Sequence, residues 1–219
     1  MSLVSKQLTR LTPLLVCVAV VAGVVCPVAM QFDRELSTSL RGFSLPGDLR
    51  KAIALSETFA HGFGVFFILL SIFVIAQQRR RAVWIVILIT ALSGLTANAL
   101  KATVVRVRPH ADGLQVIGHG EVTVDAADAV ERSFWDARQR SFPSGHSATA
   151  WGLAIGLSLL FRRGWWIFAL LATFACIQRL ESGAHYPSDV LAGMAIAFLI
   201  AACVTASPAV RSQLIEPVT

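Results

Sequence analysis

The sequence places a histidine and an aspartate four residues apart, at His185 and Asp189, with Pro187 between them. Proline suits the first turn of an α-helix, so the pair is predicted to lie where a helix begins. A carboxylate that holds an imidazole fixes its tautomer and makes the other ring nitrogen a directed nucleophile or base. The simpler alternative is an aspartate that only caps the helix. The spacing therefore favours a reactive histidine without requiring one.

A second histidine, His146, lies in the stretch of residues 142–147, whose sequence is FPSGHS. Pro143 is expected in the first turn of the next helix, where unpaired backbone N–H groups bind phosphate well. Gly145 permits the close approach of a ligand, and His146 then belongs to that first turn. A helix start with an unrelated histidine is the alternative. Together, His146 and His185 suit covalent phosphoryl transfer, in which one attacks and the other protonates the leaving group.

Three basic residues, Lys101, Arg108 and Arg179, lie at the ends of apolar segments. Lys101 and Arg108 are seven residues apart, so they are expected to share one face of a helix that Pro109 ends. Arg106 lies off this face and is left outside the expected site. Taken alone, these cations would be read as anchors at a membrane edge. Beside two histidines, three cations suit a phosphate with two or more negative charges. No His, Cys or carboxylate set has metal-ligand spacing, so no metal or other cofactor is expected.

In this order, the three clusters resemble the type 2 phosphatidic acid phosphatase superfamily of integral-membrane lipid phosphatases. The pattern of that family is K-x6-RP, then PSGH, then SR-x5-H-x3-D. Residues 101–109 match the first motif, residues 143–146 the second and residues 179–189 the third. The resemblance covers most of the chain, and three ordered motifs make it specific. One position departs, because the serine before the third-motif arginine is Gln178 here, a longer side chain that can still donate a hydrogen bond.

The resemblance implies a two-step mechanism. His185 attacks phosphorus to form a phosphohistidine while Asp189 holds its ring, and His146 protonates the leaving oxygen and later activates water. Basic side chains and donors at the helix start stabilise the five-coordinate transition state, since pre-placed donors are commonly the largest catalytic contribution. The residues implied to bind the substrate phosphate are Lys101, Arg108, Ser144, Gly145 and Arg179.

The elements that must position these residues are apolar. Of the 219 residues, 55% are hydrophobic and 15% are charged, against about 25% charged residues in a soluble domain. The composition therefore excludes a soluble globular surface and a disordered chain. Charged residues separate six apolar segments, and five of them approach or exceed the ~18–20 residues of a membrane-spanning helix. The segments are residues 12–32, 58–78, 82–100, 141–161, 164–178 and 190–210.

The predicted fold is all-α: a polytopic membrane protein with a six-transmembrane-helix bundle, which forms a single domain over residues 1–219. The short loops at residues 79–81 and 162–163 are basic and lie on the same side as the N-terminus, so the positive-inside rule places both termini in the cytoplasm. The other side has eleven Lys and Arg against eight, but twelve acids are interleaved with them. There, residues 33–57 are expected to be a connection with a short amphipathic surface helix.

The expected function is that of a membrane lipid phosphatase, a metal-independent hydrolase of a lipid phosphomonoester or pyrophosphate. Phosphatidic acid, phosphatidylglycerol phosphate, a polyprenyl pyrophosphate and lipid A phosphate all fit the residues. One alternative is a lipid phosphotransferase with a lipid hydroxyl as acceptor, and another is an anion or lipid transporter. A transporter would carry charges well inside its spans, whereas here they cluster at segment ends.

The expected location is the bacterial inner membrane, with the active site facing the periplasm or exterior. The expected partners are the lipid substrate and the bilayer, without nucleic acid, because topology explains the net charge of +6.

Overall fold

The computed structural model describes residues 3–42, 45–111, 115–117, 121–123 and 137–215. Its α-helices are α1 (Leu3–Gly42), α2 (Gly47–Leu55), α3 (Gly62–Ile75), α4 (Arg80–Lys101), α5 (Gly145–Leu160), α6 (Trp165–Glu181), α7 (Pro187–Ala206) and α8 (Pro208–Ile215). Its 3₁₀ turns are η1 (Ser56–Phe59), η2 (Gln77–Arg79), η3 (Pro109–Ala111), η4 (Ala137–Gln139) and η5 (Arg162–Gly164). Strands β1 (Gln115–Ile117) and β2 (Glu121–Thr123) pair antiparallel, with Val116 opposite Val122. The named elements of the described chain are thus helices and helical turns apart from this short hairpin.

A helix forms over most of each of the six apolar segments, namely α1, α3, α4, α5, α6 and α7. Three stretches of the described chain are long and apolar enough to cross a membrane: residues 11–42, 77–101 and 187–206. A fourth span results if α2 with η1 and α3, which meet at a bend of 72°, are counted as one. Helices α5 and α6 have 16 and 17 residues, slightly fewer than the ~20 that span hydrocarbon. The chain is therefore an integral membrane protein with three to four candidate spans.

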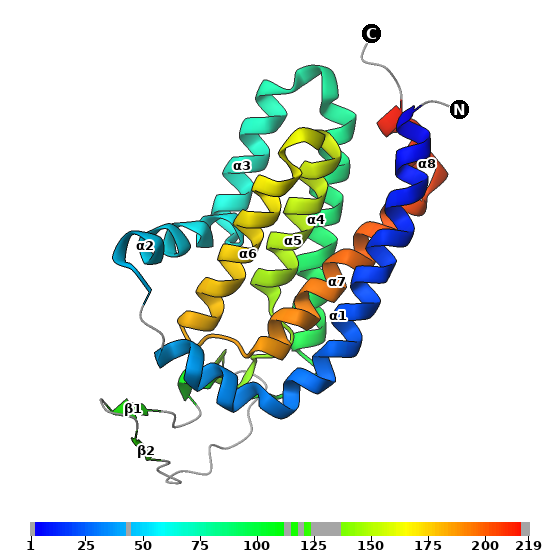
Figure 1. Cartoon of the computed structure of the whole chain (residues 1–219). Helices are drawn as coiled ribbons and strands as arrows, with labels where there is room; N and C mark the ends of the chain where they lie inside the picture. The colour runs from blue at the N-terminus through cyan, green and yellow to red at the C-terminus, as the bar shows by residue number, and fades with distance from the viewer. Residues whose placement is uncertain (1–2, 43–44, 112–114, 118–120, 124–136, 216–219) are drawn as a thin grey trace.

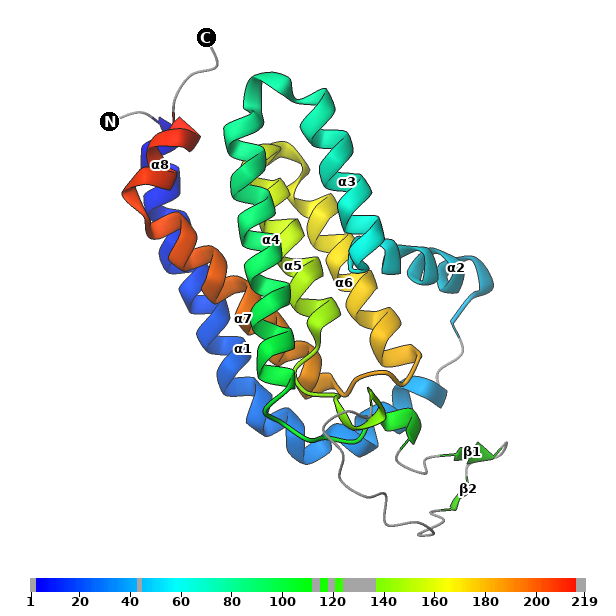
Figure 2. The same cartoon turned by 180° about the vertical axis from the view of Figure 1, so that it is seen from behind.

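Helix α5 lies at the centre of the bundle, where it packs against α4, α6 and α7, and α1 runs along α7 (Figures 1 and 2). Small residues permit the close contact of α5 with α4. A Cβ atom at Gly156 would lie 2.8 Å from Cγ1 of Val86, and one at Gly152 would lie 2.8 Å from Oγ of Ser93. Helices in a membrane associate through such close packing, because lipid is as apolar as their side chains.

Helix α1 is longer than the sequence predicts. Its apolar segment suggests an end near residue 32, but the helix continues without a break to Gly42. Asp33 and Ser37 are four residues apart, so they share one face of the helix, and each is 3% exposed. The prediction of a connection from residue 33 is therefore wrong, because this part of α1 is packed against the bundle through a polar face. Helix α2 supplies the short helix expected within residues 33–57.

The two ends of the bundle differ in character. The start of α1, helix α8 and the arginine-rich turns η2 and η5 lie at one end (Figure 1). There the guanidinium of Arg79 donates a hydrogen bond of 3.0 Å to the carbonyl oxygen of Leu160. The starts of α5 and α7, which carry the second and third motifs, lie at the opposite end.

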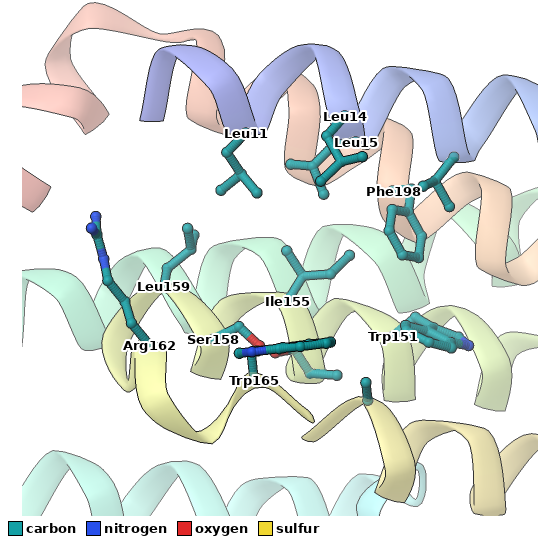
Figure 3. A pocket seen from close by; sticks show the side chains of 13 residues that line it. Leu11, Leu14, Leu15, Trp151, Ile155, Ser158, Leu159, Arg162, Trp165 and Phe198 are labelled. Carbon is teal, nitrogen blue, oxygen red and sulfur yellow. The ribbon is translucent and has the colours of Figure 1, made fainter. Parts of the chain in front are cut away.

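A cavity of about 600 Å³ lies between α1, α5, α6 and α7. Figure 3 shows Arg162 at one end of this cavity and Trp151 with Phe198 at the other. Leu15 and Ile155 contribute to walls that are mainly apolar. The cavity thus lies toward the arginine-rich end and does not contain the charged residues of the three motifs.

Candidate active site

His185 and Asp189 lie side by side at the start of α7, and Pro187 occupies the first turn as predicted. Nδ1 of His185 is 3.5 Å from Oδ2 of Asp189, and the two side chains are 1% and 0% exposed. The same carboxylate caps the helix, since it accepts a hydrogen bond of 2.8 Å from the backbone N–H of Tyr186. It also accepts one from the hydroxyl of Ser141. The two interpretations of Asp189 are therefore compatible, because one carboxylate both caps the helix and faces the imidazole.

The turn between α6 and α7 sets the position of His185 relative to Arg179. Gly183 has a φ of 66°, a left-handed conformation that favours glycine after a helix end. The carbonyl oxygen of Arg179 then accepts hydrogen bonds from the backbone N–H groups of Ala184 (3.1 Å) and His185 (3.3 Å). The five residues between Arg179 and His185 in the motif thus form the end of α6 and one tight turn.

The second motif forms the start of α5 and is fastened to the third. Ser144 is the N-cap residue and accepts hydrogen bonds from the backbone N–H (3.3 Å) and the hydroxyl (3.0 Å) of Ser147. Its own N–H donates to the carbonyl oxygen of Asp189 over 2.9 Å. Pro143 was expected in the first helical turn, but it precedes the cap, because the helix begins at Gly145. This places His146 in the first turn, as the sequence predicts.

The first motif is not helical throughout, contrary to the expectation that Lys101 and Arg108 share a helix face. Helix α4 ends at Lys101, seven residues before Arg108. Beyond it, the backbone N–H groups of Arg106 and Arg108 donate to the carbonyl oxygens of residues 139 and 138 over 2.8 and 2.9 Å. This pairing with the segment before α5 replaces the helical hydrogen bonds, so the chain runs extended from α4 towards Pro109.

Lys101 and Arg108 nevertheless lie close enough to His185 for their charges to act on it. Burial lowers the pKa of His185 below its ordinary value of about 6.5, and the charges of Lys101 and Arg108 act in the same direction. Asp189 opposes them, but the net direction is downward. Burial also lowers the pKa of Arg108, and the next largest cause is the positive charge of Arg179. The cluster therefore favours a neutral imidazole, which is the nucleophilic form of histidine.

His146 borders the same cluster, since it interacts electrostatically with Arg179, His185 and Lys101. The ring centroid of His61, the N-cap residue of α3, lies 6.3 Å from that of His146. Within the described ranges, His, Cys, Asp and Glu side chains form no group of three or more that could hold a metal ion. The positive charge of the site comes from lysine and arginine side chains.

Arg106, which its spacing in the sequence had placed outside the expected site, contacts the Asp189 carboxylate directly. Its Nη1 donates hydrogen bonds to Oδ1 of Asp189 (2.6 Å) and to the hydroxyl of Ser188 (2.8 Å). Its Nη2 forms an ion pair with Asp33 of α1, and the Tyr186 ring centroid lies 4.4 Å from the guanidinium carbon. The helical assumption hid this role, because it turned Arg106 away from the other cations.

Asp33 extends this network to the first helix. Its Oδ1 accepts a hydrogen bond of 3.0 Å from the backbone N–H of Ser188, and its Oδ2 accepts one from the Ser188 hydroxyl. Asp33 is the first charged residue after an apolar segment, which was the sequence signal for it. The start of α7 is therefore held from one side by α1 and from the other by the first motif.

Comparison with known proteins connects this arrangement to a family. The family model described as the PAP2 superfamily matches residues 82–212. Lipid A 1-phosphatase of Rhizobium etli is 39% identical over 103 residues, 47% of this chain and 40% of that protein. Undecaprenyl-diphosphatase BcrC of Bacillus subtilis is 35% identical over 140 residues, 61% of this chain and 62% of that protein. The chain thus spans about two fifths of the lipid A 1-phosphatase that it matches.

Two solved structures share the fold. LpxE of Aquifex aeolicus aligns with a TM-score of 0.56 and 23% identity, over 80% of this chain and 94% of that one. The PAP2-type phosphatidylglycerolphosphate phosphatase of Bacillus subtilis aligns with a TM-score of 0.59 and 20% identity, over 92% and 94%. At these identities the likeness concerns the arrangement of helices.

Proposed function

The chain belongs to the PAP2 superfamily, and from that premise we propose that it is a membrane lipid phosphatase with its active site at the starts of α5 and α7. The observation that carries the proposal is the buried His185–Asp189 pair, with 3.5 Å between Nδ1 and Oδ2, beside three basic side chains of the family motifs. Lys101, Arg108 and Arg179 offer the charge that a phosphate dianion needs, at the edge of a membrane protein where a lipid headgroup can reach them.

The proposed reaction has two steps. In the first, Nε2 of neutral His185 attacks phosphorus, the bond from phosphorus to the lipid oxygen breaks, and His146 gives that oxygen a proton. In the second, His146 removes a proton from water and the resulting hydroxide attacks phosphorus. The bond from phosphorus to Nε2 of His185 breaks, and inorganic phosphate leaves. Asp189 stabilises the imidazolium character that develops on His185, because its carboxylate faces Nδ1.

Phosphate binding is assigned to residues placed before the reaction begins. The Ser144 N–H already donates to the Asp189 carbonyl oxygen, so the backbone N–H of Gly145 at the start of α5 is the one assigned to the phosphate, as helix starts bind phosphate oxygens. Lys101, Arg108 and Arg179 neutralise the charge of the transition state. Donors that are fixed in advance need not reorganise during the reaction, which is why they contribute strongly to the rate.

Two lipid phosphates have the strongest support as substrates. A lipid A phosphate is supported by the relative from Rhizobium etli, and undecaprenyl diphosphate by the relative from Bacillus subtilis. Phosphatidic acid and phosphatidylglycerol phosphate share the same reacting group. A lipid hydroxyl in place of water in the second step would make the enzyme a phosphotransferase, and analysis of the products distinguishes the two.

We also propose that six helices, α1 and α3–α7, cross a bacterial inner membrane, with both termini in the cytoplasm and the site facing the periplasm. The arginine-rich turns η2 and η5 lie at the same end of the bundle as the start of α1 (Figure 1). Short basic loops favour the cytoplasmic side. Labelling of single cysteines placed in η2 and in η3 with a membrane-impermeant reagent tests this orientation, and labelling of η2 in intact cells would contradict it.

The function is tested by phosphate release from a panel of lipid A, undecaprenyl diphosphate, phosphatidylglycerol phosphate and phosphatidic acid, with purified protein in detergent. We expect release from at least one of them, and loss of that release in His185→Ala while the thermal midpoint is unchanged. A folded wild-type protein that releases phosphate from none of them, or an equally active His185→Ala variant, would overturn the proposal. Transport without hydrolysis would then be the reading to pursue.

A further inference from the structure

Gln178, the residue that departs from the family motif, takes part in a closed ring of contacts around Arg179. Its Oε1 accepts a hydrogen bond from Nε of Arg179. Nη2 of Arg179 forms an ion pair of 2.6 Å with Oε1 of Glu57, and Nε2 of Gln178 donates to Oε2 of Glu57 over 3.3 Å. We call Glu57 and Gln178 the Arg179 clamp. Glu57 belongs to η1 and lies outside the family match over residues 82–212.

The clamp contacts one edge of the Arg179 guanidinium, the edge formed by Nε and Nη2. A guanidinium has five N–H donors in a fixed planar fork, and here Nε and Nη2 serve Gln178 and Glu57. Nη2 carries a second N–H on the edge that it shares with Nη1, and the contacts with Gln178 and Glu57 do not require that edge. Two parallel donors on one edge are what a phosphate accepts in a bidentate contact. Fixing one edge therefore orients the other.

The length of Gln178 matters for this geometry. Its amide reaches Arg179 with the oxygen and Glu57 with the nitrogen, whereas a serine hydroxyl at the same position is too short to join both. The Arg179 side chain is 12% exposed, so the surrounding protein restricts its conformations. Without the clamp, its long and flexible stem would keep more rotamers, and fixing them on binding would cost entropy.

We propose that Glu57 and Gln178 are positioning residues that hold Arg179 with its Nη1–Nη2 edge toward the substrate phosphate. The inference rests on the proposed function, since it assigns Arg179 to phosphate binding. The competing interpretation is that Glu57 blocks Arg179 and must leave before phosphate binds. The two interpretations predict opposite effects of removing the carboxylate.

The experiment compares Glu57→Gln, Gln178→Ser and the double variant with wild type, using the panel lipid that wild type hydrolyses fastest. Glu181→Gln is the matched control, because Glu181 also pairs with an arginine, Arg50, over 2.6 Å but does not contact Arg179. For each variant, kcat, KM and inhibition by orthovanadate are measured. Orthovanadate mimics five-coordinate phosphorus, so its affinity reports transition-state binding.

Positioning predicts a loss of kcat/KM in both single variants, up to about 100-fold as for other misplaced catalytic groups. Vanadate inhibition weakens by a similar factor. The kcat/KM of the double variant is little lower than that of the worse single variant, because both residues act through one arginine. Glu181→Gln behaves as wild type. Tighter inhibition by vanadate in Glu57→Gln overturns the proposal in favour of blocking. Unchanged kinetics, or losses that follow the thermal midpoint, overturn it as well. A folded wild type that is inactive on every lipid refutes the proposed function instead.

Discussion

Replacing Arg106 with alanine would leave two buried carboxylates, those of Asp33 and Asp189, without their counter-charge. The carboxylates are 3% and 0% exposed, and the Arg106 side chain is 22% exposed. Removing one partner of a buried ion pair typically costs about 3–5 kcal/mol, because the remaining charge stays buried. Since Arg106 is partly accessible, we expect Arg106→Ala to lower the free energy of unfolding by about 3 kcal/mol, near the lower end of that range.

The measurement is equilibrium unfolding in mixed detergent micelles, followed by the helical signal. Arg50→Ala is the control. The Arg50–Glu181 ion pair has the same N–O distance as the Arg106–Asp189 pair, 2.6 Å, but its arginine side chain is 69% exposed. Exposed pairs contribute about 0–1 kcal/mol. The double variant Arg106→Ala/Asp33→Asn should recover part of the loss, since one stranded charge is removed. If Arg106→Ala costs no more than Arg50→Ala, the network does not hold the start of α7 as we argue.

Three further predictions concern pH, packing and metal. Because the pKa of His185 is lowered, its neutral form persists as pH decreases, so loss of the nucleophile should not reduce kcat/KM at any pH above ~6.5. A decrease in kcat/KM that sets in at or above that pH as the solution is acidified would contradict the burial of His185. Gly193→Ala places a Cβ 2.3 Å from the carbonyl oxygen of Ser144, so the variant should lose about 1–3 kcal/mol of stability and most of its activity. The control is Gly23→Ala, whose Cβ has nothing within 4 Å and which should lose neither stability nor activity. Chelator should leave phosphate release unchanged, since basic side chains supply the positive charge; loss of activity that added metal restores would refute this.

The sequence was sufficient where structure is decided locally. Pro187 at the start of α7 and His146 in the first turn of α5 both follow from short-range rules for helix starts. Most of each of the six apolar segments likewise forms a helix, because apolar length and the absence of charge suffice to predict one.

The errors arose where distant parts of the chain meet. The residues between Lys101 and Arg108 were predicted to be helical from their spacing, but pairing with the segment before α5 draws them into an extended strand-like course. Asp33 was assigned to a connection because a charge follows an apolar run, yet its contacts with Arg106 and Ser188 keep it buried on a continuing helix. No local pattern carries such long-range contacts, which is why Arg106 and Asp33 were missed.

The central claim is that His185 carries the phosphoryl group during the reaction, and trapping that intermediate tests it most directly. A substrate with radiolabelled phosphate is mixed with wild type, His146→Ala and His185→Ala, and the protein is denatured in alkali, in which phosphohistidine persists. We predict label on wild type, label on His146→Ala that both forms and disappears more slowly because His146 acts in both steps, and none on His185→Ala. Label that remains on His185→Ala, or phosphate release by wild type without any labelled protein, would contradict the mechanism.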